Sequence, residues 1–270
     1  MDRVFLRDVD EERSGIARDE VMRALDVVID PELDEPITDL GFVHTVDVVP
    51  DGDGASEATG RKWNVEVHLR LPTSFCAPNF AYLMASDAKD VLTALDWTNV
   101  VVVELDDHHD SEIINGGLAA DAGYRGTFRH EAEEDLDELR VTFQRKAHTA
   151  AMERCLTALL RADPARPVEQ LGSVTIADLP EDATAESLLR RRASIGLSTS
   201  PGDLVMVDHL GIGYAPDAVP LALRRARSTR ISIDGNAHFC RGLLRTRYVD
   251  GGSETIEQPS TFIPLSALTH

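Results

Sequence analysis

The sequence predicts an α/β (α+β) protein in which helices pack on a small mixed sheet, and three observations support this prediction. Residues 63–71 alternate apolar and polar side chains, which is the pattern of a strand buried on one face. Residues 79–95 carry apolar side chains at helical spacing. Residues 99–105 (NVVVVEL) form a short continuous apolar run that is typical of a buried strand. Strand, helix and strand in this order favour one sheet covered by helices.

The other elements of the first half are predicted from similar local patterns. Residues 1–14 are expected to form a loose arm. Residues 17–29 are predicted to form a helix that ends before Pro31, because a proline disfavours the helical conformation of the residue before it. Residues 42–49 are predicted to form a strand, and the polar, glycine-containing residues 50–61 a long hairpin loop.

The second half gives weaker local signals. Short apolar runs predict strands, and longer periodic segments predict helices. Helices are predicted at 131–160, 187–195 and 216–227 and strands at 204–207 and 230–233, while 238–248 fits neither pattern. A glycine-rich segment that ends near Gly126 is predicted to close the first domain. The chain is therefore divided into a domain at 15–126 and a C-terminal α/β domain of unknown type at 127–270.

The composition argues against two classes of partner, nucleic acids and anionic membranes. The 270 residues carry a net charge of −20, whereas nucleic acids and anionic membranes are bound by clustered positive charge. The acidic N-terminus does not resemble a signal peptide, and charged residues interrupt every stretch long enough to span a bilayer. The cytoplasm is the expected compartment.

The cysteines predict neither a disulfide framework nor a self-contained cysteine-rich metal site. Cys76, Cys155 and Cys240 are odd in number, far apart in the sequence and without a C-x-x-C pair. Cys76 is predicted to lie in the turn between a strand and a helix, where unpaired amides and the helix dipole favour a thiolate. The alternative is that Cys76 is a small buried side chain of the core.

Three motifs in the first half point to one family when they are taken together. They are DPE at Asp30–Glu32, DLG at Asp39–Gly41, and Thr73 three residues before Cys76. This combination resembles the metal–sulfur cluster biosynthesis family. That family includes a eukaryotic cytosolic iron–sulfur targeting subunit, a bacterial accessory protein of the sulfur-mobilisation system, and accessory proteins of phenylacetate ring oxygenation. The resemblance covers residues 19–110, roughly a third of the chain.

The resemblance implies an iron–sulfur-assembly-like domain that helps to install iron–sulfur clusters or iron centres in client enzymes. Cys76 would be the ligand of a transiently bound iron or iron–sulfur cluster, and Thr73 would shape its turn. Asp30 and Glu32 would lie on the neighbouring loop, close to the site. The family usually places proline directly after the cysteine, whereas here Pro78 comes one residue later, so the turn must differ.

A single thiolate cannot complete an iron–sulfur site with four ligands. The missing ligands would come from a second copy of the chain, from a client or from small thiols. The implied partners are therefore a client metalloenzyme or iron–sulfur assembly proteins, and a homodimer is a further possibility.

Other polar groups give alternative hypotheses. His108 and His109, within the DDHHD stretch at 106–110, are a second set of candidate metal ligands. A solvated loop after a strand is the commoner explanation of such a stretch, because adjacent side chains on an extended chain point apart and rarely share one ion. His44 and His68 are expected to lie on strands and to be able to face each other across the hairpin, or to be ordinary surface histidines. The carboxylates between Asp30 and Asp39 are either an acid/base pair or a loop held by hydrogen bonds to the backbone.

The sequence thus supports three hypotheses of different classes. The first is a non-catalytic maturation factor whose second domain recognises a client, such as a multicomponent iron-dependent oxygenase. The second is a metal-free protein–protein assembly scaffold, suggested by the altered Cys76-Ala77-Pro78 turn. The third is a metal-dependent enzyme that uses His108 and His109.

Overall fold

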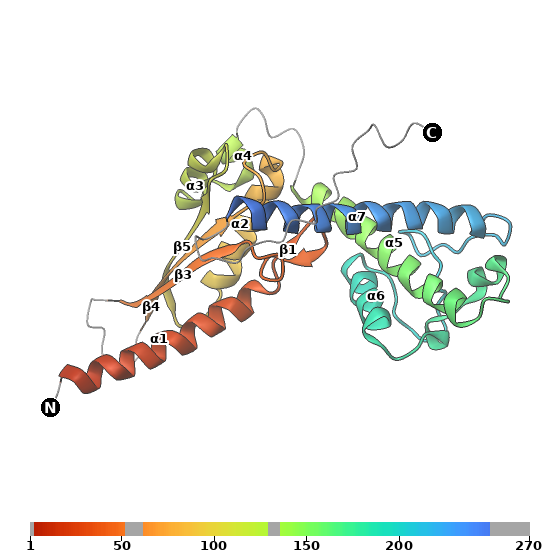
Figure 1. Ribbon diagram of the computed structural model, residues 1–270, viewed down its shortest axis with the longest axis horizontal. Coiled ribbons are helices and arrows are strands. Elements are labelled where there is room, and N and C mark those ends of the chain that lie inside the picture. Colours follow the sequence, from red (N-terminus) through yellow and green to blue (C-terminus); the bar gives the residue numbers. More distant parts are fainter. Residues whose placement is uncertain (1–2, 52–61, 129–135, 249–270) are drawn as a thin grey trace, which may run out of the picture.

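The computed structural model describes residues 3–51, 62–128 and 136–248, and for residues 3–13 it describes the backbone alone. A sheet-containing N-terminal part is followed by a helical C-terminal part (Figure 1). This arrangement confirms the predicted mixed α/β class. None of the helices in these ranges combines the length and the apolar character that a bilayer crossing requires.

The N-terminal part contains a three-stranded mixed sheet. Its elements are α1 (Arg3–Leu25), β1 (Ile29–Asp30), β2 (Glu35–Pro36), β3 (Val43–Pro50), β4 (Trp63–Arg70), α2 (Pro78–Thr93), β5 (Thr98–Asp106), α3 (Ser111–Ala119) and α4 (Gly123–Phe128). The strand order is β3-β4-β5, with β4 antiparallel to β3 and parallel to β5. Helix α2 makes the crossover that a parallel pair needs. Strands β1 and β2 form a separate two-stranded ribbon.

The alternation of β4 is confirmed, and it defines the two faces of the sheet. Trp63, Val65, Val67 and Leu69 are buried, and the residues between them are exposed or half-buried. The buried face packs against α1 and α2, whose own buried side chains belong to the same core. The polar side chains of β4 therefore lie on the opposite face of the sheet, away from α1 and α2.

One expectation for the first half differs from the structure. The loose arm predicted for residues 1–14 is wrong for the described part, because α1 already begins at Arg3. The glycine-rich segment that ends near Gly126 was predicted only to close the first domain, and it contains the start of α4 at 123–128. The predicted hairpin loop at 50–61 falls mostly on residues 52–61, which lie outside the described residues.

The C-terminal part is helical rather than α/β. It contains α5 (Leu136–Ala162), the short 3-10 helices η2 (Val168–Ser173) and η3 (Ile176–Asp178), α6 (Ala183–Ser194) and α7 (Val219–Arg247). The strand predicted at 204–207 is reduced to two isolated bridges, Thr175–Leu204 and Val207–Gly213. The strand predicted at 230–233 is wrong, because these residues lie inside α7.

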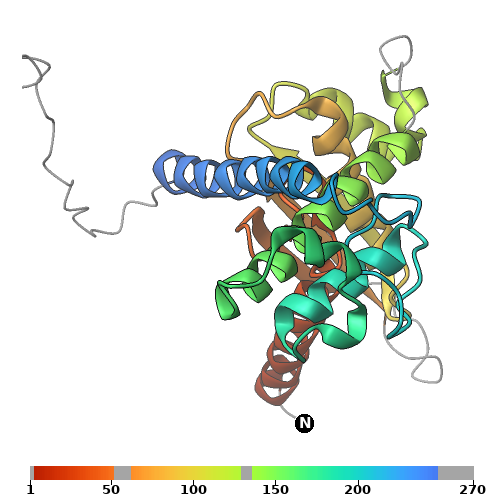
Figure 2. The same ribbon diagram turned by 90° about the vertical axis from the view of Figure 1, so that its right-hand side faces the viewer.

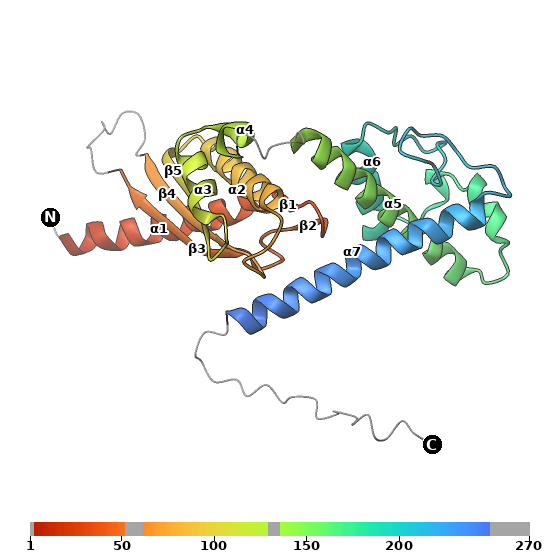
Figure 3. The same ribbon diagram turned by 90° about the horizontal axis from the view of Figure 1, so that it is seen from above.

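Helix α7 connects the two parts. In the part of the chain that the structure describes, most buried apolar residues fall into two clusters, one in the sheet-containing part and one between α5, α6 and the beginning of α7. Ala237 and Leu244, near the other end of α7, belong to the first cluster. Figure 2 looks onto the helical part, and Figures 1 and 3 show α7 running from it back toward the sheet. The domain boundary at 126/127 stays a prediction.

Candidate functional site

The turn between β4 and α2 contains Cys76. The hydroxyl of Thr73 accepts a hydrogen bond from the backbone N–H of Phe75 (3.0 Å), so the threonine closes the turn locally. Helix α2 begins at Pro78, whose missing N–H costs nothing in the first turn. The preceding Ala77 offers no side-chain cap. Cys76 is thus the last side chain with a polar atom before the open N-terminus of α2.

The loop that follows β5 forms hydrogen bonds with this turn. The backbone N–H of His109 donates to the carbonyl of Ser74 (2.9 Å). His108 is 7% exposed, and its Nε2 lies 2.9 Å from the carbonyl of Cys76, while its Nδ1 accepts from the N–H of Asp110 (3.1 Å). Both ring nitrogens of His108 are therefore engaged by the backbone, with the proton assigned to Nε2.

Burial raises the pKa of the Cys76 thiol, in contrast to the thiolate expected at a helix start. The backbone amide of Thr73 acts in the opposite direction on this pKa. The negative charges of Asp30 and Glu32 raise the pKa further, and Arg247 lowers it. The difference arises mainly because the turn is half-buried, which the sequence alone does not reveal, and Asp30 and Glu32 add to it.

Asp30 and Glu32 lie within electrostatic reach of Cys76. Asp30 is 7% exposed, and its Oδ1 accepts hydrogen bonds from the N–H groups of Glu32 and Leu33, both at 2.8 Å. Burial raises the pKa of Asp30 to about 6 despite these two bonds. Glu32 accepts a hydrogen bond from Asn236 of α7 (3.0 Å). One carboxylate therefore shapes the loop, and the other binds the C-terminal helix.

Arg247, in the last turn of α7, binds the Cys76 turn directly. Its guanidinium donates to the carbonyl of Leu71 (3.1 Å), the hydroxyl of Ser74 (2.8 Å) and the carbonyl of Asp107 (2.6 Å). The same side chain therefore joins α7 to the turns that follow β4 and β5. Sequence analysis missed this residue, because 238–248 showed no clear pattern and nothing indicated where that segment packs.

Cys240 is the second thiol near the site, and it was also missed. Cys240 and Cys76 are half-buried and pack against the same core. Burial, followed by the neighbouring Cys76, raises the pKa of Cys240 to about 11. Cys155 lies instead in the core of the helical part, where its Sγ donates to the carbonyl of Thr184 (3.5 Å). The three cysteines that are far apart in sequence therefore divide into a pair and a single residue.

Two histidines meet on the open face of the sheet. His44 Nδ1 lies 3.1 Å and His68 Nδ1 lies 2.9 Å from the two carboxylate oxygens of Asp106, and His68 Nε2 lies 3.0 Å from Glu66. The two rings thus share one carboxylate across the strands. Within residues 14–51, 62–128 and 136–248, whose side chains the structure describes, no group of three or more histidine, cysteine or acidic side chains could hold a metal ion.

The acidic loop that follows β1 is held by basic residues of the C-terminal part. Asp34 pairs with Arg191 of α6 at 2.6 Å, and Glu35 pairs with Arg241 of α7. Burial raises the pKa of Asp34, although Arg191 lowers it. These carboxylates therefore link the two parts of the chain, which is a structural use that the sequence alone left open.

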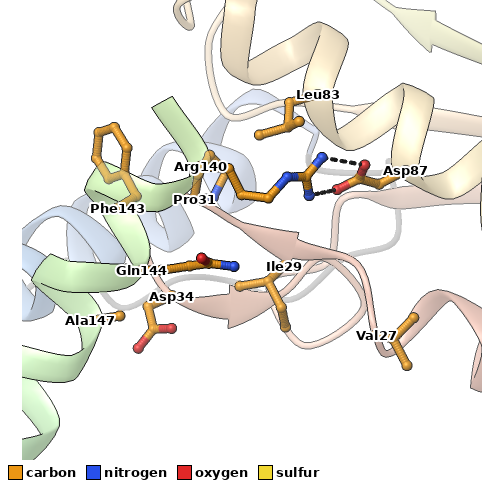
Figure 4. A pocket seen from close by; sticks show the side chains of 10 residues that line it. All are labelled: Val27, Ile29, Pro31, Asp34, Leu83, Asp87, Arg140, Phe143, Gln144 and Ala147. Carbon is orange, nitrogen blue, oxygen red and sulfur yellow. Dashed lines mark hydrogen bonds and ion pairs between the residues drawn. The ribbon is translucent and has the colours of Figure 1, made fainter. Parts of the chain in front are cut away.

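A small pocket lies beside this loop, between β1, α2 and α5 (Figure 4). Its volume is about 170 Å³, and it is lined by Ile29, Leu83 and Phe143 together with polar groups. Arg140 closes one side by a two-pronged pair with Asp87, at 2.7 and 2.9 Å. The pocket is spatially part of the junction between the two parts, and Cys76 does not line it.

Comparison with known families gives one match. Residues 18–105 match a family model described as iron-sulfur cluster assembly protein. Residues 18–105 are therefore similar to an iron–sulfur cluster assembly protein, and this matched stretch is called the assembly domain from here on. The matched range begins in α1, ends in β5 and includes Cys76, Thr73 and the acidic loop. Searches of curated proteins and of solved structures gave no match.

The match confirms the family predicted from the DPE, DLG and Thr-x-x-Cys motifs. It indicates a role in iron–sulfur cluster assembly for the chain. The matched range ends well before α5, so α5, α6 and α7 lie outside it. These helices supply the side chains of Arg191, Arg247 and Cys240, which reach the acidic loop and the Cys76 turn.

Proposed function

We propose that this protein is a maturation factor that carries iron or an iron–sulfur cluster on Cys76 and delivers it to a client metalloenzyme. The observation that carries the proposal is the family match of the stretch that contains Cys76. The half-buried thiol in the turn before α2 supports it, because cargo can reach such a thiol and be released from it.

The cargo must take part of its ligands from outside the described chain. Iron–sulfur clusters are usually held by four cysteines, and no group of three suitable side chains comes together in the described ranges. An incomplete ligand set suits a carrier, because a client or a second copy can supply the missing ligands. A transient complex or a homodimer is therefore part of the proposal.

The test is the iron and acid-labile sulfide content after anaerobic reconstitution. We compare the wild-type chain with Cys76→Ala and with Cys155→Ala, a control whose thiol lies in the other core. Stoichiometric iron and sulfide in the wild type and the control, lost in Cys76→Ala, would support the carrier. Light scattering of the loaded protein would then detect a dimer that shares ligands.

A metal-free assembly scaffold is the second candidate. The raised pKa of Cys76 supports it, because a protonated thiol is a poor metal ligand until a cation displaces the proton. This candidate predicts that the wild type and Cys76→Ala are equally free of metal and still bind the same client. A metal-dependent enzyme built on His108 and His109 has less support, since both ring nitrogens of His108 already bond to the backbone.

We further propose that the client is a multicomponent iron-dependent oxygenase. The support is the resemblance of the Asp30–Glu32, Asp39–Gly41 and Thr73/Cys76 motifs to accessory proteins of phenylacetate ring oxygenation. The test is the iron content of such an oxygenase, co-expressed with the wild-type chain or with Cys76→Ala. Equal iron content in both cases would exclude this client.

A further inference from the structure

We propose that Cys240 joins Cys76 in a two-thiol site for a thiophilic iron ion or for the edge of an iron–sulfur cluster. The C-terminal helix would then contribute a ligand to the assembly domain from outside the matched range of 18–105. The inference rests on the proposed function of Cys76 and adds a residue that the family match does not include.

The first argument is the face of α7 on which Cys240 lies. Positions three and four apart share one face of a helix, so Ala237, Cys240 and Leu244 point the same way. Ala237 is 3% and Leu244 is 8% exposed, and both belong to the core of the assembly domain. The Cδ2 atom of Leu244 also lies against Gly41. Cys240, between them, therefore faces the assembly domain.

The second argument is that polar contacts fix α7 on both sides of Cys240. One turn before it, Asn236 donates to Glu32 at 3.0 Å. Two turns after it, Arg247 donates to the hydroxyl of Ser74 at 2.8 Å, within the Cys76 turn itself. These contacts restrict both the sliding and the rotation of the helix. The thiol of Cys240 is thereby kept beside the turn.

The third argument is the charge environment that the two thiols share. Asp30 and Glu32 are acidic neighbours of both thiols, and Cys76 is in turn a neighbour of Cys240. Acidic neighbours disfavour thiolates but attract a cation. The positive neighbour of Cys76 is Arg247, whose guanidinium is already occupied by hydrogen bonds to the turns. The pair therefore suits a positively charged, thiol-seeking ligand.

The chemistry of loading follows from these surroundings. Two S–H bonds break, the two protons pass to solvent, and two sulfur–metal bonds form, with no change of oxidation state. Soft thiolates select such metals over Mg²⁺ or Ca²⁺. Two thiolates leave coordination positions open, and the client would fill these positions when it receives the cargo.

The first experiment measures proximity and needs no metal. Dibromobimane becomes fluorescent when both of its arms have reacted with thiols, so it reports thiol pairs that lie close together. We expect fluorescence with the reduced, full-length wild type and with Cys155→Ala, and none with Cys76→Ala or Cys240→Ala. Absence of the bridge in the folded wild type would overturn the inference.

The second experiment measures metal binding by titrating the same four proteins with Cd²⁺ and following the thiolate-to-metal absorption. We expect Cys240→Ala to weaken binding by at least about tenfold, because even groups that only support metal ligands contribute that much. Alanine is a good helix former, and thermal unfolding would verify that the variant is folded.

The outcomes separate the two proposals. Binding that is lost in Cys76→Ala but unchanged in Cys240→Ala would overturn the two-thiol site and leave the carrier function standing. A wild type that binds neither Cd²⁺ nor reconstituted iron would overturn both. Weakened binding in each single variant, with Cys155→Ala unchanged, would support both.

Discussion

The guanidinium of Arg247 donates a hydrogen bond of 2.8 Å to the hydroxyl of Ser74, which joins the last turn of α7 to the turn that holds Cys76. The same guanidinium reaches the carbonyls of Leu71 and Asp107. Both α7 and the assembly domain therefore contribute side chains to the environment of the Cys76 thiol.

Replacing Arg247 by alanine is expected to loosen the end of α7. The change removes the donors for Leu71, Ser74 and Asp107, and each lost bond to a charged donor costs on the order of 1 kcal/mol. Hydrogen–deuterium exchange at the backbone amides of residues 241–248 should therefore become faster. Arg245→Ala, which changes an exposed residue of the same turn, is the matched control. Equal exchange in both variants would show that Arg247 does not hold the helix.

Replacing His68 by glutamine is expected to lower stability mainly at acidic to neutral pH. The hydrogen bond to Asp106 raises the pKa of His68 above its usual 6.5, although burial acts against this. A raised folded-state pKa stabilises the protein below the unfolded value, and this stability is lost as pH rises through the folded pKa.

Asp106, the partner of His68, determines the lower end of the pH range in which this interaction stabilises the protein. Partial burial raises the pKa of Asp106, but the hydrogen bonds from His68 and His44 outweigh it and hold that pKa below its usual 3.8. The contribution is therefore lost again as pH falls through the lowered pKa.

Denaturant unfolding at several pH values tests this window. Wild type and His68→Gln should differ by about 0.5 kcal/mol near pH 5 and converge at alkaline pH. The exposed His238→Gln is the control. A difference that does not vary with pH would contradict the assignment.

Local sequence patterns predicted the sheet because its elements obey local rules. The alternation in β4 sets the buried face, and the apolar run at 99–105 becomes β5. The two strands pair in parallel with Val67 opposite Val103, and both of these side chains are buried. Each of these features depends on a few residues that are neighbours in the sequence, so local sequence patterns are enough to predict the strands.

Helix α7 was predicted only in part, because its middle locally favours a strand. Ile231 and Ile233 are β-branched, and such residues prefer strands. In the helix, Ile233 is 8% exposed, whereas Ile231 is 56% exposed. The apolar spacing that continues through Ala237, Cys240 and Leu244 was the signal that could have extended the predicted helix.

The composition of the site could not be predicted fully, because it depends on where α7 and α6 pack. The motifs identified Cys76 and its turn, and they placed Asp30 and Glu32 on one loop. They contained no information about Cys240 or Arg247, which approach from the other end of the chain. Without these neighbours, the electrostatics of the thiol could not be derived either.

His148 of α5 provides a test of the helical part through its pH dependence. The residue is 1% exposed, and its Nε2 atom has no hydrogen-bond partner within the part of the chain that the structure describes. Burial, with a further contribution from Arg192, lowers the pKa of His148 from 6.5 to about 4. The unfolded chain therefore takes up a proton at a higher pH than the folded protein does.

Because the folded pKa is the lower one, stability should fall as pH decreases from about 6.5 to about 4, by about 3 kcal/mol in total. His148→Leu removes this proton uptake and also the unpaired nitrogen, whose burial costs about 1 kcal/mol. Denaturant unfolding at about pH 7.5 and pH 5 should thus show a variant that is more stable than the wild type, and by a larger margin at pH 5. The exposed His209→Leu serves as the control. An equal margin at both pH values would mean that His148 binds its proton in the folded state as readily as in the unfolded chain, so the side chain would have access to water.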